Sequence, residues 1–139
     1  MVKCVSALGD GMMRSRAIVA LRSVAAVFVA LYTLPLVNQI GGELAPVLRM
    51  PRGGEVRLAY DLAWVMLAGI TGSALMVALA AVAKTAHAWA FFALYMAVGL
   101  VVTWLAWDDF PRWFTLACVL TLPLQVWLGW WLAWGRRRA

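Results

Sequence analysis

The sequence predicts an all-α membrane protein in which four transmembrane helices form an antiparallel bundle. Three observations predict this class. Of the 139 residues, 65% are hydrophobic and only 13% are charged, whereas soluble domains contain about 25% charged residues. Long stretches of the chain contain almost no charged residue, and basic residues and tryptophans gather where these stretches begin and end.

The central part of the chain shows the pattern most clearly. Two uncharged stretches, 62–83 and 85–107, are separated by Lys84 alone. A helix of 22 residues is about 33 Å long, which is enough to cross a hydrocarbon core of about 30 Å. Backbone polar groups in lipid must be satisfied within the segment, so each stretch is predicted to be helical. We expect transmembrane helices over 58–83 and 86–107.

The N-terminal part is predicted to hold a basic cytoplasmic tail, 1–16, and a first transmembrane helix over 17–37. Arg22 lies near the start of this helix, where its long side chain can reach the lipid headgroups. Pro35 is expected to help end the helix. We do not expect cleavage as a signal peptide, because the uncharged run 23–42 is long for the apolar region of such a peptide.

An outer loop is expected over 38–57, because this stretch is rich in residues that break regular structure. Its breakers are Gly41, Gly42, Pro46, Pro51, Gly53 and Gly54. Arg49 and Arg52 could meet phosphate headgroups at the outer interface. An ordinary solvated loop is the alternative.

The fourth helix is expected over 112–134, with Asp109 able to cap its N-terminus. Pro123 lies at its centre and should kink it, because proline lacks the backbone N–H that a continuous helix uses. Gln125 is close enough to fill the resulting gap in hydrogen bonding, or to bond to a neighbouring helix. Residues 136–139 are expected to form a basic cytoplasmic C-terminus.

The distribution of charge predicts that both termini face the cytoplasm. With the N-terminus inside, eight Lys and Arg residues lie on the inner side and four on the outer side, as the positive-inside rule requires. Eight of the nine tryptophans lie near the two interfaces, where aromatic belts occur. We therefore expect a protein integral to the plasma membrane of a bacterium, its inner membrane.

The sequence contains no catalytic or metal-binding motif that we could identify. It has one histidine, and its acidic residues lie at the edges of the spans, so haem, zinc or di-iron chemistry is not expected. Cys4 and Cys118 are predicted to lie at different depths, so no disulfide is expected. The formal charge of +6 is explained by topology and anionic lipid rather than by nucleic acid. We expect no cofactor, metal or nucleic-acid partner.

Two polar groupings are candidate binding sites. Charged residues at the outer rim could bind a cation, a headgroup or a partner's basic loop, although helix caps and solvated turns are the simpler explanation. A polar layer near the membrane midplane could line a pocket for a lipid or quinone ring, although hydrogen bonds between helices are simpler. The outer rim consists of Asp61, Asp108, Asp109 and Arg112, and the midplane layer includes Tyr32, Ser73, Tyr95, Thr121 and Gln125.

Two further sets of residues are assigned structural roles. Small residues on the second and third helices predict close contact between helices; these are Gly69, Gly72, Ser73 and Gly99. Basic residues near the membrane surfaces are expected to contact lipid headgroups; these are Arg22, Arg49, Arg52, Arg136, Arg137 and Arg138.

The pattern favours a non-enzymatic accessory subunit that packs against a larger membrane protein or against a second copy of itself. A small oligomeric transporter or channel is the first alternative, and it requires assembly because one bundle of four helices is too thin to enclose a path. A lipid- or quinone-binding membrane enzyme that uses the outer carboxylates is the second alternative. It is weakest because no acid–base pair is evident. Membrane lipids are expected partners.

Overall fold

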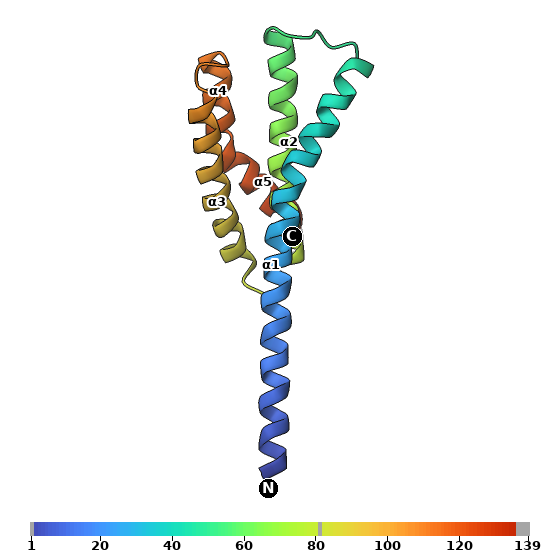
Figure 1. The fold of residues 1–139 in the computed structure, drawn as a ribbon, viewed down its shortest axis with the longest axis vertical. Coiled ribbons are helices and arrows are strands. Elements are labelled where there is room, and N and C mark those ends of the chain that lie inside the picture. The colour runs from blue at the N-terminus through green and yellow to red at the C-terminus, as the bar shows by residue number, and fades with distance from the viewer. Residues whose placement is uncertain (1, 81, 136–139) are drawn as a thin grey trace.

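Figure 1 shows the chain, in a computed structural model, as helices joined by short connections. The structure describes the backbone of residues 2–80 and 82–135 and, within these ranges, the side chains from residue 17 onward. Four segments of the described chain are long and apolar enough to cross a membrane: Ala17–Val47, Glu55–Leu79, Lys84–Leu105 and Arg112–Trp134. This confirms the prediction of an all-helical protein with four helices of membrane-spanning length and hydropathy.

Helix α1 spans Val2–Val47, so the prediction that the helix ends at residue 37 is wrong. Pro35 and Pro46 lie inside the helix. Both prolines are exposed, so each removes one backbone hydrogen bond without disturbing the packed face of α1. Gly41, predicted to break the helix, instead contacts α2: its carbonyl accepts the Tyr60 hydroxyl at 2.8 Å. This contact supports the additional helical turns that replace the first part of the predicted loop.

Helix α1 ends in a left-handed turn at Arg49, whose φ is 55°. The Arg49 N–H donates to the Pro46 carbonyl at 3.1 Å, and the Met50 N–H donates to the Ala45 carbonyl at 2.9 Å. This pair of bonds is the Schellman pattern, which satisfies carbonyls left free at a helix end. Glycine usually occupies the left-handed position, so the presence of arginine there concealed the helix end from sequence reasoning.

Helices α2 and α3 span Glu55–Leu79 and Lys84–Leu105. Helix α2 begins directly after Gly54, whose φ of 87° lies in the region that favours glycine. Both helices end a few residues earlier than predicted. Ala83 adopts a φ of 48° immediately before α3, so the chain turns ahead of Lys84 and this lysine opens α3.

The fourth predicted helix is divided into α4, Arg112–Leu120, and α5, Leu122–Trp134. The break falls at Thr121, two residues before Pro123, which is where a proline is expected to disturb a helix. Figure 1 shows that α5 leaves the line of α4 and runs toward α2. The proline therefore directs the C-terminal helix into the middle of the molecule.

The N-terminus of α4 differs from the prediction that Asp109 caps it. The residue at the cap is Pro111, and no side chain makes a capping hydrogen bond there. The Pro111 carbonyl accepts the backbone N–H groups of Phe114 at 3.0 Å and Thr115 at 3.3 Å. The prediction is wrong because the helix starts three residues after Asp109, beyond the reach that N-capping requires.

Helix α2 lies at the centre of the packing, with contacts to α1 and to α5. Helix α1 presents the fully buried Ala26 and Ala30, and an ideal Cβ on Gly72 of α2 would lie 3.1 Å from the Ala30 carbonyl oxygen. Such small residues let two backbones approach closely, which matters because lipid provides no hydrophobic drive between helices. The buried apolar cluster comprises Ala26, Ala30, Met76, Phe91, Tyr95, Leu122 and Val126.

Candidate functional site

A chain of hydrogen-bonded side chains lies between α3 and α5. Tyr95 donates its hydroxyl to Gln125 Oε1 at 2.9 Å, and Gln125 Nε2 donates to Thr121 Oγ1 at 2.9 Å. Thr121 donates to the Ala117 carbonyl at 2.8 Å. Gln125 is fully buried and Tyr95 is 8% exposed. Each of these side chains therefore has a protein partner, which a hydrocarbon environment requires of polar groups.

Two residues of α2 complete the surroundings of this polar network. Ser73 is fully buried and donates its hydroxyl to the Val126 carbonyl of α5 at 2.9 Å. A Cβ on Gly69 would collide with Gln125 Oε1 and with the Tyr95 hydroxyl. Gly69 therefore makes room for the network. Four of the predicted midplane residues come together here: Ser73, Tyr95, Thr121 and Gln125.

Tyr32, the fifth predicted midplane residue, does not join them. Its side chain is 70% exposed, whereas Ala30 is fully buried against α2. Two residues along a helix correspond to a rotation of about 200°, so Tyr32 lies on the outer surface of α1. Similar depth in the membrane places residues in one layer, but rotation about each helix axis decides which of them meet.

The glycines predicted to pack helices lie at contacts between elements. Gly69 and Gly72 are buried, and an ideal Cβ on Gly99 would lie 2.9 Å from the Leu122 side chain. A further close contact, absent from the prediction, involves Gly129 of α5. A Cβ there would lie 2.5 Å from the Ile70 carbonyl oxygen and 2.6 Å from the Ser73 Cβ. The signal was present in the sequence, because Ala133 follows Gly129 at the four-residue spacing of small-residue pairs.

The predicted outer rim is brought together only in part. Arg57 Nε lies 3.0 Å from both carboxylate oxygens of Asp61. A cavity of about 620 Å³ between the α1–α2 and α3–α4 connections is lined by charged residues of both signs: Arg52, Glu55, Arg57, Asp61 and Asp109. Asp108 and Arg112 are exposed and do not line this cavity. Acids and arginines therefore offset one another at the helix ends, as solvated charges commonly do.

The arginines predicted to meet lipid headgroups divide into two groups. Arg22, Arg49 and Arg52 are exposed, so their guanidinium groups are free to extend from the helix surface. Arg136, Arg137 and Arg138 lie outside the residues that the structure describes.

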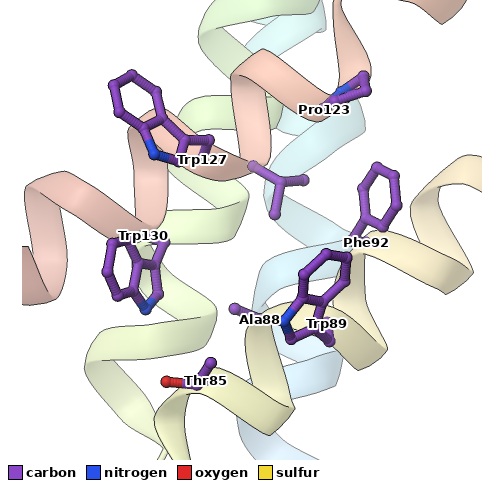
Figure 2. A pocket seen from close by; sticks show the side chains of 8 residues that line it. Thr85, Ala88, Trp89, Phe92, Pro123, Trp127 and Trp130 are labelled. Atoms are coloured by element: carbon purple, nitrogen blue, oxygen red, sulfur yellow. The ribbon is translucent and has the colours of Figure 1, made fainter.

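An apolar groove of about 400 Å³ runs between α3 and α5. Its lining residues are Thr85, Ala88, Trp89, Phe92, Pro123, Val126, Trp127 and Trp130 (Figure 2). Trp89 is 67% exposed and Trp127 is 55% exposed, so the groove is open along its side. Sequence reasoning placed these tryptophans only by depth and did not identify the groove.

A basic residue, Lys84, lies next in sequence to one end of this groove. Lys84 precedes the lining residue Thr85, and its ammonium group lies 4.6 Å from the centre of the Trp134 ring. Trp130, one turn before Trp134, carries an indole Nε1 that is buried and has no hydrogen-bond partner in the described part of the chain. Basic and aromatic groups thus meet at the end of α3 and α5 that lies next to the α2–α3 connection.

A second surface of α3 consists of small side chains, and we call it the alanine face. It consists of Ala86, Ala90, Ala93 and Ala97, all of them exposed. Their spacing of four, three and four residues places them on one stripe of a helix. This spacing was visible in the sequence, but it could not show whether the stripe is buried within the chain or left uncovered.

No metal site is evident, because the described residues contain no group of three His, Cys, Asp or Glu side chains that could hold an ion. Comparison with protein-family models, with curated proteins and with solved structures gives no match for this chain. Function must therefore be inferred from the arrangement of the helices and from the surfaces that they expose.

Proposed function

We propose that the chain crosses the bacterial inner membrane four times as antiparallel helices, with both termini in the cytoplasm. There it serves as a non-enzymatic subunit that packs α3 against a helix of a larger membrane protein. The four apolar helices support the crossing, and the excess of basic residues on one side of the membrane supports the orientation. The observation that supports the subunit role is the uncovered alanine face of α3.

The alanine face is suited to a partner helix because of how helices associate in lipid. Apolar surface alone gives no preference for a protein over a lipid tail, so association depends on close backbone approach and hydrogen bonds. Within this chain, small residues at Gly72 and Ala30 lie where two helices meet. Ala90 and Ala93 offer the same kind of surface to the outside.

The closed polar network supports the subunit role over the alternatives. A transporter needs polar groups that face a water-filled path, and an enzyme needs groups that reach a substrate. Ser73 and Gln125 are instead fully buried and hydrogen-bonded within the protein. Their arrangement favours a role in packing.

The test is site-specific photo-crosslinking in native membranes. A photoreactive residue at position 93 should give one adduct of discrete mass with a different membrane protein, and Ala90→Leu in the same chain should abolish it. The matched control is a photoreactive residue at position 25, where Ala25 of α1 is also exposed. Equal adducts from both positions would contradict the subunit role. An adduct only with a second copy of the chain would favour the oligomeric transporter instead.

A further inference from the structure

We propose that the groove between α3 and α5 holds an acyl chain of an anionic glycerophospholipid, with the headgroup phosphate at Lys84. The proposal depends on insertion of the helices in a membrane and not on the subunit role. The groove and the alanine face are neighbouring stripes of α3, with centres about 120° apart at about 100° per residue. The two proposals therefore concern different stripes of the helix, and each has its own test.

The shape of the groove suits an elongated apolar group. From Thr85 to Phe92 the groove follows α3 for seven residues, which corresponds to about 10 Å. This is about a third of a hydrocarbon core of about 30 Å, so the groove reaches from one end of the helices into a single leaflet. Its walls are largely aromatic, and Figure 2 shows Trp89 and Phe92 of α3 on one side, with Trp127 and Trp130 of α5 on the other.

The charge of Lys84, beside one end of the groove, suits a phosphate group. The ammonium of Lys84 is held over the Trp134 ring at 4.6 Å, next to Thr85, and a lysine at this position can bind phosphate as a point charge. No described carboxylate lies at this end of the helices. The described carboxylates lie in or near the α1–α2 and α3–α4 connections, at the other end of α2 and α3: Glu43, Glu55, Asp61, Asp108 and Asp109.

The test uses the full chain in phosphatidylcholine vesicles that contain a small fraction of lipid with brominated acyl chains, which quench tryptophan fluorescence on contact. The quenching gives the ratio of the protein's affinity for brominated phosphatidylglycerol to its affinity for brominated phosphatidylcholine. We expect a ratio of roughly five, the factor expected from one basic residue near the surface. Lys84→Gln should bring the ratio close to one, and Lys84→Arg should retain most of it. Equal quenching by the two lipids in the unchanged chain would overturn the proposal.

A second pair of variants separates the groove from general attraction to the membrane surface. Ala88→Met narrows the groove and should remove the preference for phosphatidylglycerol, whereas Ala97→Met makes the same change on the alanine face and should retain it. A preference that survives Ala88→Met would overturn the proposal, because the lipid would then be held by surface charge alone. The Lys84 variants keep the test decisive if Ala88→Met fails to fold. Crosslinking from position 93 is a separate readout, so failure of the lipid site is distinguishable from failure of the subunit role.

Discussion

The two sides of α2 are held to their neighbours by different kinds of contact. On the α1 side the surfaces are small and apolar, with Ala26 and Ala30 fully buried and Gly72 beside the Ala30 carbonyl. On the α5 side, Ser73 donates to the Val126 carbonyl and Gly129 lies against the α2 backbone. Each side also has a hydrogen bond between helices: the bond from Tyr60 to the Gly41 carbonyl on the α1 side is only partly buried, whereas the bond from Ser73 on the α5 side is buried.

This difference shows how a helix in lipid obtains a defined position. Small apolar surfaces permit close approach, but similar surfaces at neighbouring turns can also fit one another. A buried hydroxyl such as that of Ser73 must meet an acceptor or remain unsatisfied, which is costly in hydrocarbon. The buried bond from Ser73 therefore fixes the register of α5 against α2, whereas the position of α1 depends mainly on complementary shape, with the partly buried bond from Tyr60 as an addition.

The largest expected effect is on the α5 side. In Gly129→Ala the new methyl group would lie 2.5 Å from the Ile70 carbonyl oxygen and 2.8 Å from the Ala74 nitrogen, and backbone atoms cannot move aside easily. We expect the free energy of unfolding to fall by about 1–3 kcal/mol. Denaturant titration in mixed micelles, followed by circular dichroism, measures this change.

The matched control for that variant is Gly42→Ala in α1. An ideal Cβ at Gly42 has no heavy atom within 4 Å, and alanine has a higher helix propensity than glycine in a helix interior. Its stability should be unchanged or slightly raised. Equal losses in the two variants would mean that close contact between α2 and α5 does not contribute to stability.

The second effect tests the polar network. Gln125→Leu leaves the Tyr95 hydroxyl without its acceptor, so we expect a loss of about 1–2 kcal/mol in the free energy of unfolding. A double-mutant cycle with Tyr95→Phe should show a coupling of about 0.6 kcal/mol, the average for such bonds in membranes, and no more than about 1.7 kcal/mol, the maximum. Strictly additive losses would show that Tyr95 and Gln125 do not stabilise one another.

The smallest effect is expected on the α1 side. Tyr60→Phe removes the hydroxyl that donates to the Gly41 carbonyl at 2.8 Å, which should lower the free energy of unfolding by about 0.5–1 kcal/mol. The remaining contact between α1 and α2 is made by shape and is retained. Tyr32→Phe is the control, because Tyr32 is exposed on α1 and its change should have no measurable effect. A loss in Tyr60→Phe as large as that in Gly129→Ala would remove the distinction between the two sides.

The number and approximate limits of the spans were predictable, because long uncharged stretches admit few structures in lipid. The length of α1 was not, because Pro35, Gly41 and Pro46 usually interrupt helices in water. Two of these residues are tolerated on an exposed face, and Gly41 accepts a hydrogen bond from Tyr60 of α2. Such long-range contacts are not visible in local sequence patterns.

The candidate sites were predictable to a similar degree. Depth along the helices grouped Ser73, Tyr95 and Gln125; in the structure Tyr95 bonds to Gln125 and Ser73 bonds to the carbonyl of the next residue, Val126. Depth could not exclude Tyr32, because the rotation of α1 depends on its packing against α2. The groove between α3 and α5 depends on the direction that α5 takes after Thr121, and the sequence predicts a kink there without predicting its direction.

The bond between Ser73 and Val126 also bears on how the chain is made. The two residues are 53 positions apart, so at roughly 5–20 residues per second the ribosome needs about 3–10 seconds to supply the acceptor. During that interval a serine in a membrane helix can bond to a carbonyl of its own preceding turn. The arrival of α5 then exchanges this local bond for the one to Val126, so Ser73 reaches its final partner only after α5 has been synthesised.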